Sequence, residues 1–279
     1  MSYSSVLIQF LNGLTGASTL FLVAAGLSLI FGVSRIVNFA HGSLYMLGMY
    51  VAVSAAERVG FWLAVPAAAL AVGLLGALLE ILVLRRIYKA PELLQLLATF
   101  ALVLVAKDAA LWFWGPEDVL GPRAPGLSGA IEIAGAAFPQ YDLLVIALGP
   151  LVLLGLQGLL TRTRWGILVR AATEDREMAA ALGVDQRRLF TAVFALGALL
   201  AGLGGALQIP REPASLAVDL TVIADAFVVV VVGGLGSIPG AFLAALIIGE
   251  VKSFCIGFGF SKATLVIEFV VMALVLVAR

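Results

Sequence analysis

The sequence predicts an all-α, polytopic membrane protein with about eight or nine transmembrane helices. Apolar residues make up 62% of its 279 residues and charged residues only 12%, and the mean hydropathy is +1.13. Soluble domains are typically about 45–50% apolar and about 25% charged, so this chain has too few charges to cover a water-facing surface. A soluble enzyme and a disordered chain are both excluded, which leaves a helical membrane bundle.

The residue counts exclude several kinds of site. Lys plus Arg and Asp plus Glu both number 17, so no basic surplus exists for binding nucleic acid. Cys255 is the only cysteine and His41 the only histidine. A disulfide within the chain, a multi-cysteine metal site and a paired-histidine zinc site are therefore excluded. Because no GxxxxGK[ST] phosphate loop occurs either, we expect no metal and no bound cofactor.

Nine apolar segments are candidates for helices that cross a membrane, each of which needs about 20 mostly apolar residues. The first has no positively charged flank, so we expect a retained helix and not a cleaved signal. The seventh and eighth are short and share a glycine-rich break, so they form two spans or one broken re-entrant pair. We predict a single membrane domain over 1–279. The segments cover residues 6–30, 37–56, 61–84, 93–114, 141–160, 189–209, 222–237, 240–256 and 262–278.

The positions of Lys and Arg predict the orientation, because cytoplasmic loops are enriched in these residues. The connection at 85–89 carries three basic residues and the loop at about 161–188 carries six, so both should be cytoplasmic. The loops at about 115–140 and 210–221 carry one arginine each and should be external. Nine crossings then place the N-terminus outside and Arg279 in the cytoplasm. Eight would leave Arg279 outside, so we predict nine.

The external loop over about 115–140 contains three prolines before Pro139, together with many glycines. This composition favours turns or short hairpins over a helix. The loop is the longest outward-facing connection. It is either a docking site for an external partner or a passive connector.

The first polar motif lies in the second segment, within GVSRIVNFAHGSLYMLGMY (32–50). It places Asn38, His41, Ser43 and Tyr45 among apolar residues, and polar groups at membrane depth must find partners or line a cavity. Asn38, His41 and Tyr45 are spaced i, i+3 and i+7, so they share one helix face. That face either lines a solute pathway or, for His41 in particular, ties two helices together.

The second motif is a predicted amphipathic helix in the cytoplasmic loop, from Ala171 to Leu182. Its residues are good helix formers, and Gly183 is a natural C-terminal stop. Apolar residues such as Met178 share the helix with a polar run over 174–177. Such a helix either docks in a groove of another protein or lies on the lipid surface.

The third motif is VVVVVGGLGSIPGA (228–241), where glycines, a serine and a proline interrupt an apolar run. A membrane helix cannot continue unbroken through it. Irregular backbone is tolerated at membrane depth where it is buried or lines a wet cavity, and its freed N–H and C=O groups can bind a polar solute. The motif is therefore either a solute-binding break or a tight cytoplasmic turn between two spans.

Ionisable residues within the segments are costly, by about 2.5–3.5 kcal/mol each at a helix centre. Lys107 and Asp108 point about 100° apart on a helix, so they should pair with other helices and not with each other. Glu80 lies near Arg85 and should snorkel to the surface. Glu268 should pair across a subunit interface. Asp225 and Glu250 should face the bundle interior, a subunit interface or a helix end.

Small residues in GALLAGLGGAL predict close helix packing, either within the bundle or against a second membrane subunit. They follow the small-xxx-small spacing of tightly packed membrane helices and comprise Gly197, Ala201, Gly204 and Gly205.

The three motifs, in this order, resemble the inner-membrane permeases of branched-chain amino-acid ABC importers, specifically their H-type subunit. NFAHGSLYMLGMY (38–50) looks like the signature of that subunit, and GGLGSIPG (233–240) matches it closely. Glu177-x-Ala-x-x-x-Gly183 resembles the EAA loop that docks ABC permeases onto their ATPases, although the Ile-x-Leu-Pro tail of its fullest form is absent. The resemblance covers about 26–278, and a urea-type permease is homologous to the H-type subunit.

The resemblance implies a bacterial inner-membrane transport subunit, surrounded by lipid, with no ATPase site of its own. Its partners would be an M-type permease subunit, two cytoplasmic ATP-binding subunits that bind the ATP, and a periplasmic substrate-binding protein. The substrate pathway would comprise Asn38, His41, Ser43, Tyr45, Gly233, Gly234, Gly236 and Ser237. Coupling to the ATPases would use Glu174, Glu177, Ala179, Ala180 and Gly183.

Two alternatives remain open. Within the same class, the solute could be urea, a short-chain amide or another amino acid. In a different class, the chain could be a stand-alone channel or a secondary transporter. That alternative would explain the intramembrane charges and the broken segments, but not the EAA-like helix.

Overall fold

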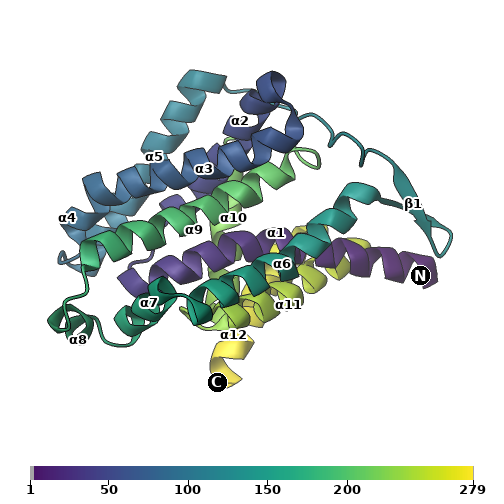
Figure 1. The fold of residues 1–279 in the computed structure, drawn as a ribbon. Helices are drawn as coiled ribbons and strands as arrows, with labels where there is room; N and C mark the ends of the chain where they lie inside the picture. The colour runs from purple at the N-terminus through teal and green to yellow at the C-terminus, as the bar shows by residue number, and fades with distance from the viewer. Residues whose placement is uncertain (1–2, 279) are drawn as a thin grey trace.

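The computed structural model describes residues 3–278 and is almost entirely helical; Arg279, predicted to be cytoplasmic, lies outside the described residues. Nine helical rods in this range match the nine predicted segments (Figure 1). They are α1 (Tyr3–Ser34), α2 (Ala40–Val59), α3 (Phe61–Leu79) with the π-turn η1 (Glu80–Leu84) and α4 (Arg85–Ile87), α5 (Glu92–Trp114), α6 (Gln140–Arg162), α9 (Gln186–Gln208), α10 (Val218–Gly233), α11 (Ile238–Gly257) and α12 (Thr264–Ala278).

Short elements complete the chain. The strands β1 (Ala130–Ile133) and β2 (Ala136–Pro139) form an antiparallel hairpin, which confirms the prediction of short hairpins in the 115–140 loop. The helices α7 (Arg164–Glu174) and α8 (Arg176–Ala181) occupy the loop before α9, and a 3-10 turn, η2 (Ser261–Ala263), precedes α12.

Six helices within the described residues are long and apolar enough to cross a membrane on length and composition alone. The helices α2, α10 and α12 do not reach that standard, since α10 has 16 residues, α12 has 15, and α2 mixes polar residues into its 20. Large apolar side chains such as Leu74 on α3 and Trp112 on α5 are exposed, as a lipid environment requires. The chain is a multi-pass helical membrane protein.

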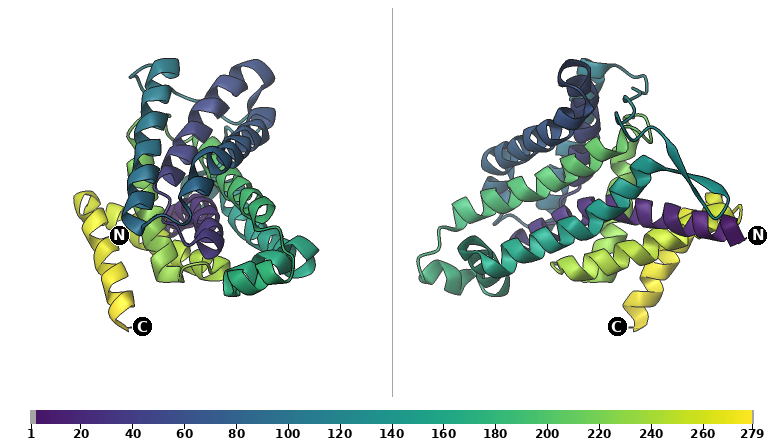
Figure 2. Two further views of the ribbon diagram at one scale, coloured as in Figure 1. Left: turned by 90° about the vertical axis from the view of Figure 1, so that its left-hand side faces the viewer. Right: turned by 45° about the vertical axis from the view of Figure 1, so that its right-hand side comes forward.

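Connections gather at two ends of the bundle, which we call the hairpin end and the α8 end. At the hairpin end, Val119 and Ala214 exchange two backbone hydrogen bonds of 2.9 and 2.8 Å, joining the predicted external loops. At the α8 end, the Arg176 guanidinium lies over the Tyr88 ring, 5.7 Å from its centroid. The two arginine-rich connections therefore share one end, as the charge pattern predicted. Figure 2 shows α12 projecting from the side of the bundle.

The helix α9 packs against α1, α2 and α3, and glycines make these contacts close. A Cβ on Gly197 would lie 2.8 Å from the carbonyl oxygen of Gly26 on α1. A Cβ on Gly205 would collide with the carbonyl oxygen of Tyr45 on α2. The prediction that this small-residue stretch serves packing is confirmed.

Gly205→Ala should therefore destabilise the bundle by about 1–3 kcal/mol, because the added methyl forces α2 and α9 apart. Gly155→Ala is the matched control, since nothing lies within 4 Å of a Cβ at Gly155. Thermal unfolding in detergent micelles measures both variants. Equal melting temperatures for the two would contradict this account of the α2–α9 contact.

Candidate functional site

A cavity of about 460 Å³, which we call the central cavity, opens between α1, α10 and α11 in the half of the bundle nearer the hairpin end. Its volume falls within the range of small-molecule sites, about 300–1,000 Å³. Four charged residues, Arg211, Glu212, Asp225 and Lys252, line it. Side-chain amides and an aliphatic wall complete the lining, with Gln9, Asn12, Gln208, Leu20, Val23, Val222 and Ile256 among its residues. The cavity thus offers both signs of charge beside apolar surface.

One wall of the central cavity is held by a three-residue ionic cluster. Lys252 Nζ on α11 lies 2.6 Å from Asp225 Oδ2 on α10 and 3.0 Å from Glu268 Oε1 on α12. The Glu268 side chain is only 1% exposed, and a charge buried to this degree requires a partner. The prediction that Glu268 pairs across a subunit interface is wrong, because α12 folds back and places its carboxylate beside Lys252 of the same chain.

The polar face predicted on α2 is divided between the cavity and the packing of the bundle. Tyr45 lines the central cavity. His41 is fully buried, with Nε2 3.0 Å from the carbonyl oxygen of Val23, so it ties α2 to α1. Asn38 is also buried, and its backbone carbonyl accepts the backbone N–H of His41 at 3.2 Å. Solute contact by these residues stays a prediction.

Ser43 belongs to a second buried ionic cluster. Its hydroxyl donates to Asp219 Oδ2 at 3.4 Å, and Lys107 Nζ on α5 lies 3.1 Å from Asp219 Oδ1. This cluster joins α2, α5 and α10. The prediction that Lys107 pairs with another helix is confirmed.

The glycine-rich motif forms a tight turn between α10 and α11 at the α8 end. Gly234 and Gly236 have positive φ values of 92° and 86°, and the Ser237 hydroxyl caps α11 by accepting the Gly240 N–H at 3.1 Å. A Cβ on Gly233 would lie 2.5 Å from the Gly240 backbone, so this position requires glycine.

Of the two interpretations of this motif, the tight turn between two helices is the one that the structure shows. Gly236 and Ile238 line a smaller cavity of about 140 Å³, together with Thr173 and Glu174 of α7. The motif therefore meets the segment predicted to couple to ATPases. Solute contact by Gly233, Gly234, Gly236 and Ser237 stays a prediction.

The predicted single helix over 171–182 is wrong, because the chain forms two helices broken at Asp175. The Asp175 carboxylate accepts the Met178 N–H at 2.9 Å and so starts a new helix, α8. The predicted stop at Gly183 is confirmed. Gly183 has a φ of 87°, and the N–H groups of Gly183 and Val184 bond back to Ala180 and Ala179 in the pattern of a Schellman motif.

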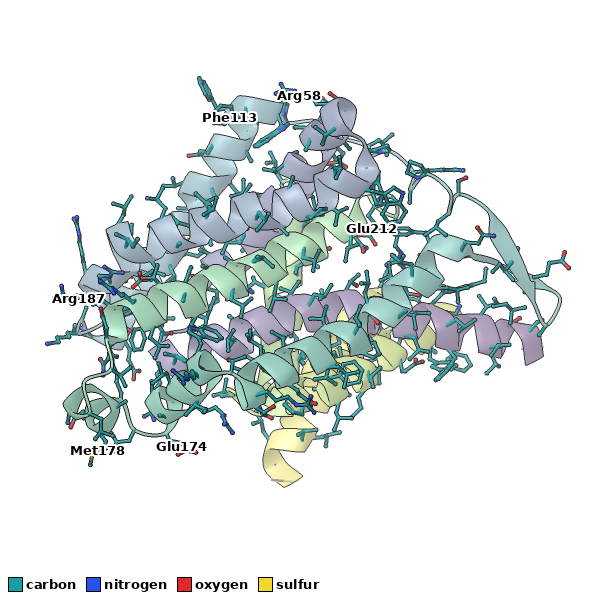
Figure 3. All side chains as sticks on the ribbon, in the orientation of Figure 1. Arg58, Phe113, Glu174, Met178, Arg187 and Glu212 are labelled. Carbon is teal, nitrogen blue, oxygen red and sulfur yellow. The ribbon has the colours of Figure 1, made fainter. Side chains whose placement is uncertain are left out.

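The predicted coupling residues lie at the α8 end and face outward, except for one. Glu174, Glu177, Ala180 and Gly183 are exposed, whereas Ala179 is buried against the bundle. In Figure 3, Glu174 and Met178 lie at one extremity of the molecule and Glu212 lies far from them toward the other. The predicted coupling surface, formed by these exposed residues, and the central cavity are therefore separated along the bundle.

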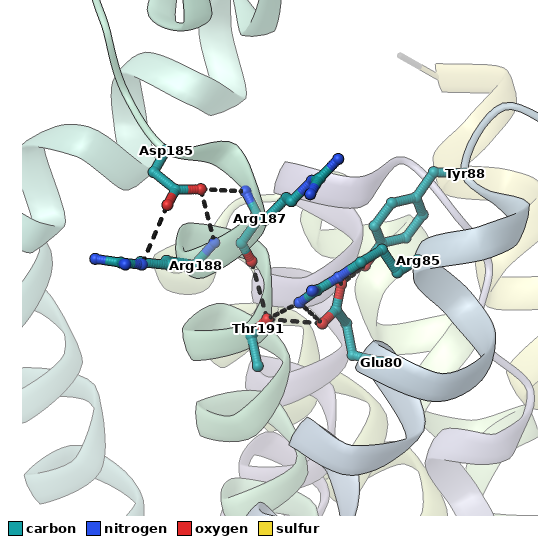
Figure 4. Close-up of polar contacts among 7 residues, drawn as sticks. All are labelled: Glu80, Arg85, Tyr88, Asp185, Arg187, Arg188 and Thr191. Atoms are coloured by element: carbon teal, nitrogen blue, oxygen red, sulfur yellow. Dashed lines mark hydrogen bonds and ion pairs between the residues drawn. The ribbon is translucent and has the colours of Figure 1, made fainter.

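A buried polar network connects the α3–α4 rod to α9 at the α8 end (Figure 4). Glu80 is fully buried, so the prediction that it snorkels is wrong: η1 turns it inward, where Arg85 Nη2 lies 2.8 Å from Oε2. Thr191 on α9 donates to Glu80 Oε2 at 2.7 Å, and Tyr88 donates to Oε1 at 3.1 Å. Burial and the neighbouring carboxylate raise the pKa of the Tyr88 phenol, which stays a donor.

Arg176 extends this network into α8. Its guanidinium lies 4.4 Å from the centroid of the Phe190 ring and over Tyr88, a distance at which cation–π attraction acts. Its Nε donates to Gln186 Oε1 at 3.1 Å. The first residue of α8 is thus bound to both α9 and the end of the α3–α4 rod.

Several residues of the central cavity were not predicted from the sequence. Gln9, Asn12, Gly16 and Thr19 all line the central cavity from α1. They recur at i, i+3, i+7 and i+10, which places them on one helix face. This polar stripe in the first segment was the signal that could have revealed them. Lys252 is an ionisable residue inside the predicted segment 240–256, and that position was its signal, whereas Arg211 lies in a loop and had none.

The comparisons with known proteins agree on one family. Residues 9–278 match the family described as branched-chain amino acid transport system / permease component. The chain is 28% identical over 288 residues to the high-affinity branched-chain amino acid transport system permease protein LivH of Escherichia coli (strain K12), which covers 96% of this chain and 92% of that protein.

Two further relatives are similar over most of their length. The permease protein BraD of the high-affinity branched-chain amino acid transport system of Pseudomonas aeruginosa is 28% identical over 260 residues, 88% of this chain and 85% of BraD. A probable branched-chain amino acid transport permease protein LivH of Methanocaldococcus jannaschii is 30% identical over 245 residues, 85% of this chain and 77% of that protein. No solved structure matches the chain.

Glu80→Gln should destabilise the protein by about 2–3 kcal/mol, because it leaves Arg85 without its charge partner. The loss stays below the ~3–5 kcal/mol typical of a fully buried pair, since the Arg85 side chain is 30% exposed. Arg188→Gln is the control: it removes an ion pair to Asp185 at the surface, which contributes at most about 1 kcal/mol. Thermal unfolding of both variants is the measurement. If Arg188→Gln lowered the melting temperature as much as Glu80→Gln, the stabilising role of the Glu80 network would be contradicted.

Proposed function

Because the chain belongs to the branched-chain amino acid transport permease family, we propose that it is the H-type permease subunit of an ABC importer for branched-chain amino acids. The match to the family over residues 9–278 is the observation that carries this proposal. The protein would lie in the inner membrane of a bacterium with its N-terminus outside and the α8 end in the cytoplasm. The ten basic residues at that end support this orientation; they are Arg35, Arg85, Arg86, Lys89, Arg162, Arg164, Arg170, Arg176, Arg187 and Arg188.

The central cavity suits the chemistry of the proposed solute. A branched-chain amino acid is a zwitterion with an aliphatic side chain. Arg211 and Lys252 supply positive charge, Glu212 and Asp225 supply negative charge, and the aliphatic wall would receive the side chain. Polar groups placed in an otherwise apolar pocket fix the orientation of a bound molecule.

The proposed partners follow from the division of labour in such importers. Two cytoplasmic subunits would bind and hydrolyse ATP, so this chain would need no cofactor and no ATPase site of its own. An M-type permease would complete the membrane assembly, and a periplasmic substrate-binding protein would deliver the solute. At the α8 end, Met178 and Leu182 are 57% and 79% exposed, and an apolar surface of this kind supports docking of an ATPase subunit.

Uptake of labelled leucine by cells that express the chain with its partner subunits tests the proposal. Uptake should stop when ATP is depleted, and unlabelled isoleucine and valine should compete while urea does not. ATP-dependent entry of urea without leucine entry would change the solute. Leucine entry that survives ATP depletion would indicate a channel or an ion-coupled carrier and overturn the importer.

Gly183→Pro and Glu177→Arg should each lower ATP-driven uptake by about tenfold or more while the chain still inserts. Proline cannot adopt the positive φ of Gly183, so the end of α8 would unravel, and Glu177→Arg reverses an exposed charge on α8. Glu132→Arg makes the same reversal on β1 at the hairpin end and should leave uptake within about twofold. Immunoblots of membranes verify insertion. Normal uptake in both α8 variants would refute its coupling role.

A further inference from the structure

A second cavity, of about 450 Å³, opens at the hairpin end and shares residues with the central cavity. It is lined by the 123–130 part of the predicted external loop, the start of α6 and residues 210–212. Arg211 and Glu212 line both cavities. A solute that moves from one cavity to the other therefore passes these two side chains, which carry opposite charges on adjacent residues. We call this place the junction.

The backbone of the junction is held rigidly. The N–H groups of Arg211 and Glu212 both donate to the carbonyl oxygen of Gln208, at 2.9 and 3.0 Å, so they continue the last turn of α9. Ile209 is buried beneath Gly121, where a Cβ would lie 2.6 Å from the isoleucine. These contacts fix the backbone from which the two charged side chains project.

The Arg211 side chain spans the junction. Its Nε lies 3.0 Å from Asp142 Oδ1 at the start of α6, and its Nη1 donates to Gln208 Oε1 at 3.2 Å. A guanidinium has five N–H donors arranged for bidentate recognition of carboxylates. Because these contacts engage Nε and Nη1, the N–H groups of Nη2 are available to a further acceptor.

The neighbouring Glu212 complements it. The side chain is exposed, and among the residues that the structure describes it forms no ion pair. Every other charge that lines the central cavity has a partner, since Asp225 and Lys252 pair with each other and Arg211 pairs with Asp142. Glu212 is therefore the carboxylate of the cavity that is available to an incoming cation.

We propose that Arg211 and Glu212 form a site that recognises zwitterionic α-amino acids at the junction. The solute carboxylate binds the Arg211 guanidinium, in place of or beside Asp142, and the solute ammonium binds the Glu212 carboxylate. The aliphatic side chain then faces the wall of the central cavity. The inference rests on the proposed function and assigns the recognition of the solute's charges to these two residues. A neutral amide such as urea satisfies neither charge.

Uptake by the assembled importer in proteoliposomes, with its binding protein, tests this site with labelled leucine. Arg211→Gln and Glu212→Gln should each lower ATP-dependent uptake by about tenfold or more, because each removes a charge-assisted hydrogen bond to the solute. Arg211→Lys should retain part of the rate, since lysine keeps the positive charge for the solute carboxylate but loses the planar set of N–H donors.

Arg123→Gln is the matched control. Arg123 is exposed and lines the second cavity but not the junction, so its loss should leave uptake within about twofold. Wild-type rates in both Arg211→Gln and Glu212→Gln would overturn the junction site and leave the proposed function standing. Absence of leucine uptake by the wild-type importer would instead overturn the proposed function.

Asp142→Asn tests whether Arg211 acts by recognising the solute or by holding α6 in place. It removes the carboxylate that competes for Arg211 but leaves the guanidinium in place, so uptake should stay within about twofold of wild type. If Asp142→Asn lost as much uptake as Arg211→Gln, Arg211 would act by tying α6 to α9, and the recognition site would be refuted. Glu212→Gln keeps the test decisive if Arg211→Gln fails to fold, because Glu212 is exposed and supports no packing.

Discussion

The pairing of charges inside the bundle is the constraint on which the rest of the structure depends. A membrane offers no water to an ionised side chain, so each buried charge needs a partner or carries a large cost. Lys252 joins α11 to α10 and α12 through Asp225 and Glu268, and Lys107 joins α5 to α10 through Asp219. Removing either lysine would strand a carboxylate in the bundle. The short helix α10 takes part in both clusters, so these pairs fix the wall of the central cavity.

Close backbone contact is the second constraint, and it makes α9 the axis of the fold. Glycines on α9 let α1 and α2 approach until backbone meets backbone, and such contacts tolerate no added methyl. The same helix begins beside α8 and ends at Gln208, which accepts the N–H groups of the junction. One continuous helix therefore runs from the predicted coupling surface to the residues that line both cavities. The Glu80 network attaches the α3–α4 rod to this element through Thr191.

The predicted coupling surface and the central cavity lie at different ends of the bundle, and this placement has a mechanical consequence. A protein that pushes on α8 moves Arg176, which is bound to α9 and lies over Tyr88 at the end of the α3–α4 rod. The glycine-rich turn between α10 and α11 lies on α1 and α7 at this same end. A displacement there would be transmitted along α10 and α11, which hold Asp225 and Lys252 in the cavity wall. Packed helices move as units because their interfaces shift between discrete arrangements rather than deform continuously.

The sequence by itself determined the class of fold, the nine helical segments, the shared end of the arginine-rich connections and the stop at Gly183. These depend on hydropathy, charge and local backbone preference, which act within one segment of chain. The partners of Glu80 and Glu268, the break at Asp175 and the residues of the central cavity were decided by tertiary structure. A carboxylate does not show in sequence which distant helix will supply its cation. Helical spacing marks a polar stripe such as Gln9 and Asn12, but only packing of α1 against α10 and α11 turns that stripe into the wall of a cavity.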